Sequence, residues 1–117
     1  MKIMEIRLRI GSLLNGIMVY WDKIEDSARY YVKLYIKEKE SYSNKTFEQE
    51  LETVEIDRNK FYHTFQGLAR FHKQGTEFKY FVEVLAENRN GQIIARSQKL
   101  EAGINDALNV YGAVTAF

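Results

Sequence analysis

Two histidines, His63 and His72, are the only imidazole side chains that this sequence offers for chemistry near neutral pH. A catalytic zinc ion needs about three protein ligands, and no carboxylate stands at a suitable spacing beside either histidine. His63 alternates with Phe61 and Phe65, a pattern that favours an inward-facing histidine in a β-strand over a metal ligand. His72 lies within a polar segment, residues 70–75, where we expect it to be solvated.

Nucleophilic catalysis finds equally little support in the sequence. There is no cysteine, which excludes thiolate zinc sites, disulfides and cysteine nucleophiles. The serines fall in predicted loops or turns and lack a nucleophile-elbow motif: Ser12, Ser27, Ser41, Ser43 and Ser97. No glycine-rich phosphate loop occurs. The sequence therefore predicts no catalytic residue, no cofactor and no metal site, and we expect a protein that is not an enzyme.

The charged residues are balanced overall but unevenly placed. The 17 basic and 16 acidic residues give a net charge of +1, too small a field to predict nucleic-acid binding. Residues 38–57 are mainly acidic, and residues 58–79 are mainly basic. The carboxylates of the acidic run are more simply a solvated strand edge than an acid–base pair. The polarity could orient the domain on a partner, or it could reflect complementary strands that pair within one sheet.

Five tyrosines are candidates for an exposed contact surface: Tyr20, Tyr31, Tyr35, Tyr42 and Tyr62. Alternation places several of them on the outward face of the predicted strands. Exposed tyrosines provide stiff, amphipathic area that suits protein interfaces or carbohydrate stacking. Cross-strand aromatic packing on a solvated sheet explains them equally well.

The elements that would position these residues are β-strands, because apolar residues recur at every second position. The alternation is clearest at residues 5–10, 16–21, 30–37 and 78–86. Residues 41–50 indicate a loop or weak edge strand, and further strands are expected near 51–56, 61–65 and 92–101. Asn90-Gly91 predicts a tight hairpin turn. The pattern predicts an all-β protein, a seven-stranded antiparallel β-sandwich without a long helix.

The order of certain residues resembles fibronectin type III domains. Their second strand ends in Trp after alternating apolar residues, matched by Ile17, Val19 and Trp21. The third and sixth strands are matched by the remaining motif residues: Tyr30, Val32, Leu34, Tyr80, Val82, Val84, Ala86, Asn88, Gly91 and Ser97. The resemblance implies that Tyr80 bonds through its hydroxyl to the backbone just upstream. We therefore expect a core that contains Trp21, Tyr30, Val32, Leu68, Tyr80, Val82 and Val84.

The chain divides into a predicted sandwich, residues 1–102, and a C-terminal docking tail, residues 103–117. The tail has one charged residue, Asp106, and its apolar residues recur every three or four positions: Ile104, Leu108, Tyr111, Val114 and Phe117. Gly112 and β-branched Thr115 oppose a stable lone helix. Apolar surface of this extent should be buried, either on the same sandwich or in another subunit. We favour another subunit, because seven strands already close the core.

Charges at Lys2, Glu5, Arg7 and Arg9 interrupt the apolar runs of the N-terminus, so it matches neither a secretory signal nor a membrane span. If Met1 begins the protein, we expect a cytoplasmic or virion location and no membrane partner. Sandwiches of this kind recur in structural proteins of tailed bacteriophages, so the resemblance implies a virion accessory protein anchored to protein subunits. The alternative is a cytoplasmic adaptor that binds a protein or a glycan.

Overall fold

The computed structural model describes residues 3–40, 42–72 and 76–103, and in these ranges the chain forms nine β-strands and one short 3-10 helix. The larger sheet has six strands, β1 (Met4–Ile6), β8 (Ile93–Ser97), β7 (Thr76–Glu87), β4 (Arg29–Glu40) and β5 (Thr46–Asp57) in spatial order, with β9 (Leu100–Ala102) also beside β7. The smaller sheet consists of β2 (Leu8–Leu13), β3 (Gly16–Trp21) and β6 (Tyr62–Phe65). The predicted tail residues Ile104, Leu108, Tyr111, Val114 and Phe117 lie outside the described residues.

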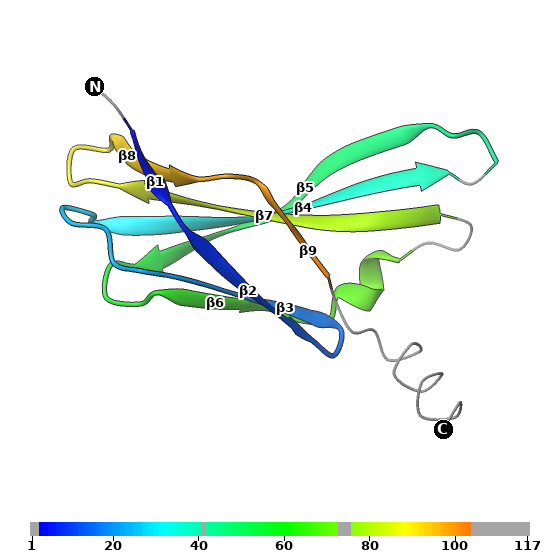
Figure 1. Cartoon of the computed structure of the whole chain (residues 1–117), viewed down its shortest axis with the longest axis horizontal. Helices are drawn as coiled ribbons and strands as arrows, with labels where there is room; N and C mark the ends of the chain where they lie inside the picture. The colour runs from blue at the N-terminus through cyan, green and yellow to red at the C-terminus, as the bar shows by residue number, and fades with distance from the viewer. Residues whose placement is uncertain (1–2, 41, 73–75, 104–117) are drawn as a thin grey trace.

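The two sheets stack face to face and bury the apolar rows of their strands between them (Figure 1). The inward rows alternate with outward residues, as the pleat of a strand requires. All seven residues expected in the core are at most 2% exposed: Trp21, Tyr30, Val32, Leu68, Tyr80, Val82 and Val84. No helix among the described residues has the length and apolar character needed to cross a membrane.

Aromatic side chains connect the two sheets. The Trp21 ring on β3 contacts the Tyr30 ring on β4 edge to face, with centroids 5.3 Å apart. The Tyr80 hydroxyl on β7 donates a hydrogen bond of 3.1 Å to the Leu68 carbonyl, which lies in the 3-10 helix η1 (Leu68–Phe71). This bond fastens the connection between β6 and β7 to the core, as the fibronectin resemblance implied for Tyr80.

The expected seven-stranded, wholly antiparallel arrangement was wrong in two places. The predicted first strand divides at Arg7, so that β1 pairs in parallel with β8 while β2 pairs antiparallel with β3. The predicted last strand divides after Ser97, because β8 and β9 pair with different parts of β7. At this break the Ser97 hydroxyl accepts a hydrogen bond of 2.8 Å from the Val84 N–H, which replaces a backbone partner.

The segment 41–50, expected to be a loop or a weak edge strand, is strand in its second half, and this strand lies at the edge of the larger sheet. β5 begins at Thr46 and pairs with β4 along almost its whole length. A bulge between Leu34 and Tyr35 shifts this pairing. The bulge leaves Leu51 of β5 without a partner on β4, and the two strands pair on both sides of it.

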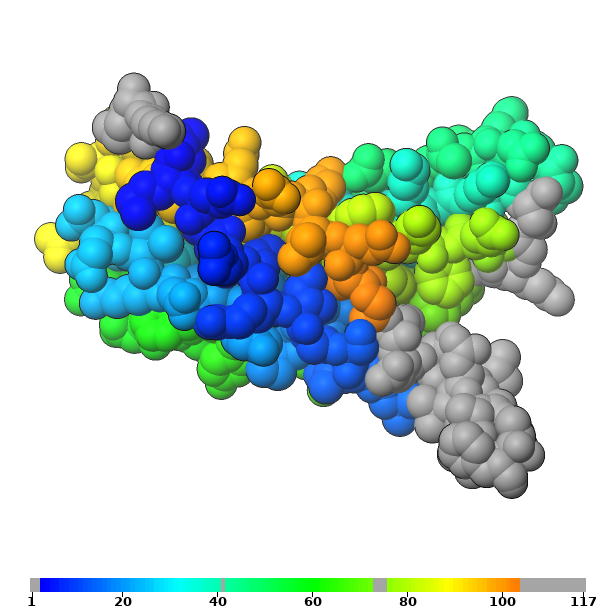
Figure 2. Space-filling view, viewed as in Figure 1, coloured from blue at the N-terminus to red at the C-terminus, as the bar shows by residue number. Residues whose placement is uncertain are grey.

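β4, β5 and β7 extend beyond the smaller sheet and form what we call the arm: residues 37–40, 46–50 and 76–79. No residue in these ranges is buried, whereas Ile36, next to them on β4, is 1% exposed. In the space-filling view the arm extends past the rest of the sandwich on one side (Figure 2). The molecule is accordingly elongated, with extents of 49, 34 and 19 Å.

A glycine pair tests the packing of the smaller sheet. A Cβ atom at Gly16 would lie 2.7 Å from the Phe65 carbonyl oxygen, whereas one at Gly11 would meet only the Met18 Cβ at 3.9 Å. We expect Gly16→Ala to lower the free energy of unfolding by about 1–3 kcal/mol, because β6 must move away from β3. Gly11→Ala should change it by less than about 0.5 kcal/mol. Urea denaturation measures both, and equal effects would contradict this packing.

Candidate functional site

The two histidines do not form a joint site. His63 lies on β6 opposite the buried Val19, so it belongs to the inner face, and its ring meets Phe65 edge to face at 4.6 Å. Burial lowers the pKa of His63, and the nearby Lys60 lowers it further. His72 stacks on Phe78 with ring centroids 4.0 Å apart and is half-buried rather than solvated as expected. In the described ranges, no group of three potential metal ligands is found.

The acidic run makes ion pairs within this molecule. Glu48 pairs with Lys99 at 2.7 Å, and Glu52 pairs with Arg70 at 2.6 Å. The remaining pairs on β5 are Glu50 with Lys33 at 3.3 Å and Glu55 with Arg29 at 3.5 Å. The acidic run and the basic run therefore do not pair as complementary strands of one sheet, because within the described part of the chain Arg70 is the one ion-pair partner from residues 58–79, and it lies in η1. Arg29 and Lys33, on the neighbouring strand β4, supply two of the other partners. Exposed pairs of this kind each contribute about 0–1 kcal/mol.

The outward tyrosines are mostly engaged by neighbouring charged residues. Tyr35 donates a hydrogen bond of 3.0 Å to Glu83, and the Lys99 ammonium lies 3.7 Å from the centre of its ring. Arg9 and Lys60 lie over the rings of Tyr20 and Tyr62 in the same way. Tyr42 is the exception, since 83% of its surface is exposed at the tip of the β4–β5 hairpin. The tyrosines therefore do not form one open contact face.

Three loops at the end of the sandwich opposite the arm surround an open cleft of about 600 Å³, which we call the loop-end cleft. It lies between the β3–β4, β5–β6 and β7–β8 connections. Its lining is polar: Lys23, Glu25, Asp26, Ser27, Arg58, Asn59, Asn88, Arg89 and Asn90. These residues are far apart in the sequence, so only the stacking of the sheets brings them together.

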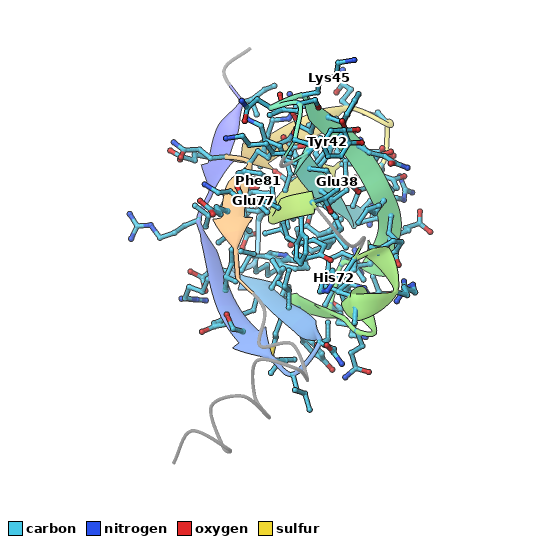
Figure 3. All side chains as sticks on the ribbon, turned by 90° about the vertical axis from the view of Figure 1, so that its right-hand side faces the viewer. Glu38, Tyr42, Lys45, His72, Glu77 and Phe81 are labelled. Carbon is cyan, nitrogen blue, oxygen red and sulfur yellow. The ribbon has the colours of Figure 1, made fainter. Side chains whose placement is uncertain are left out.

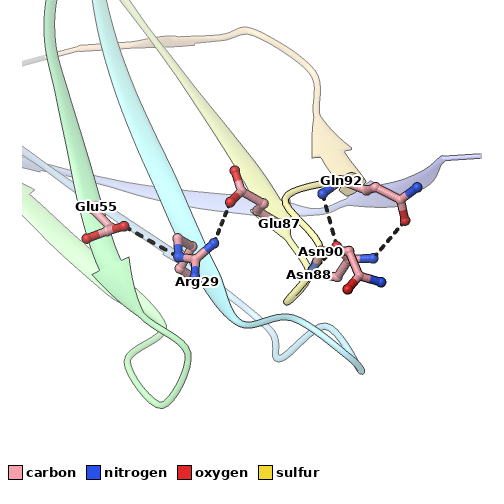
Figure 4. A network of polar contacts seen from close by, with 6 residues as sticks. All are labelled: Arg29, Glu55, Glu87, Asn88, Asn90 and Gln92. Carbon is pink, nitrogen blue, oxygen red and sulfur yellow. Dashed lines mark hydrogen bonds and ion pairs between the residues drawn. The ribbon is translucent and has the colours of Figure 1, made fainter.

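Polar contacts hold the loops around this cleft in place (Figure 4). The Arg29 guanidinium donates to Glu87 on one side and lies 3.5 Å from Glu55 on the other. In the β7–β8 turn, the Asn88 side-chain oxygen accepts hydrogen bonds from the N–H groups of Asn90 and Gln92, at 3.0 and 2.9 Å. The loop conformations are thus largely set by the protein itself, which lowers the entropy cost of binding a ligand.

The β3–β4 loop is fixed by a buried hydroxyl pair. The Ser27 hydroxyl donates to the Ile24 carbonyl at 2.7 Å and lies 3.0 Å from the Tyr30 hydroxyl, which in turn accepts the Ile24 N–H at 3.0 Å. The Ala28 N–H donates to the Glu87 carbonyl at 2.7 Å and joins this loop to β7. Tyr30 therefore supports both the core and the cleft.

Three cations of the loop-end cleft differ from most of those on the sheet faces. Lys23, Arg58 and Arg89 make no ion pair among the described residues, although Glu25 and Asp26 share the lining. Unpaired cations beside carboxamides can hold an anionic group and hydrogen-bond its neighbours. The sequence interpretation missed this cleft. The only local signals were the turn residues Asn88 to Gly91, which also occur in turns without function.

The arm offers a second candidate surface. Phe47 is 52% exposed and Tyr42 83% exposed near its tip. A hollow of about 500 Å³ on the arm, which we call the arm hollow, is lined by Lys37, Lys39, Thr46, Glu77, Phe78, Lys79 and Phe81. Figure 3 views this end, with Tyr42 and Lys45 at the hairpin tip and Glu77 and Phe81 along β7. Aromatic rings and lysine stems together suit contact with an apolar peptide.

Tyrosine ionisation tests the polar contacts of Tyr35 and Tyr80. Burial raises the pKa of Tyr80 from 10.0 to about 12, and burial with the Glu83 hydrogen bond raises that of Tyr35 to about 12. Since the folded state holds these protons more tightly, the stability they provide is complete below pH 10 and is lost as the pH rises to about 12. Tyrosinate absorbance should show that Tyr35 and Tyr80 titrate late among the 8 tyrosines. Tyr31 adds to this late phase, because burial and the nearby Glu87 raise its pKa as well.

Tyr35→Phe and Tyr80→Phe should each remove one of these late groups. Protein unfolded in urea provides the control, because all its tyrosines should titrate together. A late-titrating amplitude that neither substitution reduces would contradict the assignment.

Comparisons with known proteins give a structural likeness but no match by sequence. No family model matches the sequence, and no curated protein matches it. Among solved structures, the chain is similar to an Fn3-like protein from Clostridium thermocellum, with 17% sequence identity, a TM-score of 0.45, and coverage of 85% of this chain and 93% of that one. The two stacked sheets described above are, in themselves, consistent with a fibronectin type III-like β-sandwich.

Proposed function

We propose that this protein is a non-enzymatic structural or binding module that joins protein subunits, including its own copies, into a larger assembly. The setting we propose is the virion, as a capsid accessory or decoration protein or a tail component. The observation that carries the proposal is the arm, which extends beyond the core and exposes Tyr42 and Phe47 near its tip. Large aromatic side chains on a stiff support are typical anchors of protein interfaces.

The position of the tail supports the same function. β9 ends at Ala102 opposite Tyr80, next to the first residues of the arm. The apolar segment 104–117 follows directly in the sequence, with Asp106 as its one charged residue. An assembly contact at this end would bury the tail together with the exposed aromatic residues of the arm. Burial of such surface gains roughly 25 cal/mol per Å².

The second candidate function is a protein- or glycan-binding adaptor, and the loop-end cleft favours it. The outward tyrosines are engaged by neighbouring charges, so a small polar ligand has a better site among the loops. The three cations without ion pairs, Lys23, Arg58 and Arg89, would select a ligand with an acidic group. This function needs neither the arm nor the tail.

Light scattering coupled to size-exclusion chromatography tests the assembly function on the full chain. We expect concentration-dependent association, and we expect Leu108→Asp combined with Val114→Asp to reduce it to the monomer, because charges would replace buried apolar groups. Asn105→Asp combined with Asn109→Asp is the matched control, since it adds the same charge at polar positions of the same segment. A full chain that stays monomeric at every concentration would contradict the proposal and favour the adaptor.

A further inference from the structure

The larger sheet leaves part of β7 without a neighbour on one side. Along its whole length β7 pairs with β4. On its other side, β8 pairs with residues 85–87 and β9 with residues 80–82. Residues 77–79 have no strand on that side in the described part of the chain. An open backbone edge of this kind is a template for an added strand.

β9 would cover this edge if it continued beside β7, but after Ala102 the chain turns toward β2. In its register Ala102 lies opposite Tyr80, so the next residue, Gly103, would come opposite Lys79. Instead, the Gly103 carbonyl accepts a hydrogen bond of 2.8 Å from the Ser12 hydroxyl on β2. Figure 1 shows β9 crossing toward the smaller sheet while β7 continues into the arm. The open edge therefore begins where the chain's own last strand departs.

The arm hollow lies beside the open edge and has a definite chemistry. Glu77, Phe78 and Lys79 belong both to the edge and to the lining of the hollow. Lys37 stands opposite Lys79 on β7 and opposite Glu48 on β5, and Lys39 stands opposite Glu77. The lining itself has three lysines and one glutamate, so an added carboxylate would meet an excess of positive charge. Glu101 lies 3.8 Å from Lys79, while Lys37 and Lys39 make no ion pair among the described residues.

The C-terminal segment 104–117 has the matching chemistry. Its one charge is the carboxylate of Asp106, and Val110, Tyr111, Val114 and Thr115 are residue types that favour strands. Fully extended, these residues would reach roughly 45 Å. A segment of that length can leave its own domain and still cover a three-residue edge on a neighbour.

We propose that the segment 104–117 of one copy adds as a strand to the open edge of β7 in a second copy, with the Asp106 carboxylate facing the lysines of the arm hollow. Main-chain hydrogen bonds to residues 77–79 hold the added strand, and alternate side chains enter the hollow beside Phe81. We choose a second copy as the partner because the hydrogen bond from Ser12 holds Gly103, the last described residue, on β2 and not opposite Lys79 of its own β7. This inference rests on the proposed assembly function, for which it names the contact.

Disulfide trapping between two full-length variants tests the proposal, since the native sequence has no cysteine. One variant carries Glu77→Cys, and the others carry single cysteines at successive positions from Asn105 to Val114. After mixing and mild oxidation, we expect heterodimers whose yield alternates between neighbouring tail positions, because every second side chain of a strand faces the same way. Asn90→Cys, at an exposed residue in the turn between β7 and β8, replaces Glu77→Cys as the matched control and should give no heterodimer.

Each other outcome overturns the proposal. A heterodimer yield with maxima at every third or fourth tail position would indicate a helical tail. Absence of heterodimers would exclude the open edge of β7 as the binding site. A further variant carries both Glu77→Cys and one tail cysteine. Disulfides that form only within single chains of this variant would show that the segment binds its own domain. The charge reversal Asp106→Lys is a second measurement, and it should reduce trapping unless Lys37→Glu and Lys39→Glu are introduced in the partner variant.

The failure of this inference can be distinguished from failure of the proposed function. Light scattering that shows tail-dependent association without trapping at Glu77→Cys would leave the assembly function standing and place the contact elsewhere. A strictly monomeric full chain would overturn both.

Discussion

The burial of alternating apolar side chains between two sheets of unequal length is the constraint on which this structure depends. β4 and β7 each contribute twelve residues, whereas β3 has six and β6 has four. The shorter sheet covers the larger one from Tyr30 to Ile36 on β4, and the buried row ends there. The residues beyond that point are either exposed to water or covered by a binding partner, because the smaller sheet does not reach them. The arm is for this reason the distinctive surface of the molecule.

The charged residues on the faces of the sandwich differ from those at its ends in whether they form ion pairs. On the outer face of the larger sheet, charges are neutralised by neighbouring residues of opposite sign, such as Glu48 with Lys99 and Glu83 with Arg96. Such pairs keep a solvated face soluble and add little stability individually. At the two ends, by contrast, cations remain without ion pairs among the described residues, at Arg58 and Arg89 in the loops and at Lys37 on the arm. The ends are therefore the places where a ligand or partner gains the most from electrostatic contact.

The two ends are suited to different kinds of partner. The loop-end cleft is polar, held by side chains such as Arg29 and Asn88, and open to a small ligand. The arm has an open backbone edge and exposed aromatic residues, which favour an extended peptide. A sandwich that binds at both ends would connect two components along the long axis of the molecule. We propose this arrangement as the physical basis for a role in an assembly.

The sequence alone determined which residues face inward, because alternation is a local property that neighbouring side chains decide. It placed Trp21, Tyr30 and Tyr80 in the core, and the resemblance implied the backbone hydrogen bond of the Tyr80 hydroxyl. Only the tertiary structure decided that the first strand divides between two sheets, that β5 extends to Thr46 and that three loops meet around a cleft. These features depend on which strands pair at long sequence separation and on the twist that accumulates between them, and a period of two residues carries no information about either.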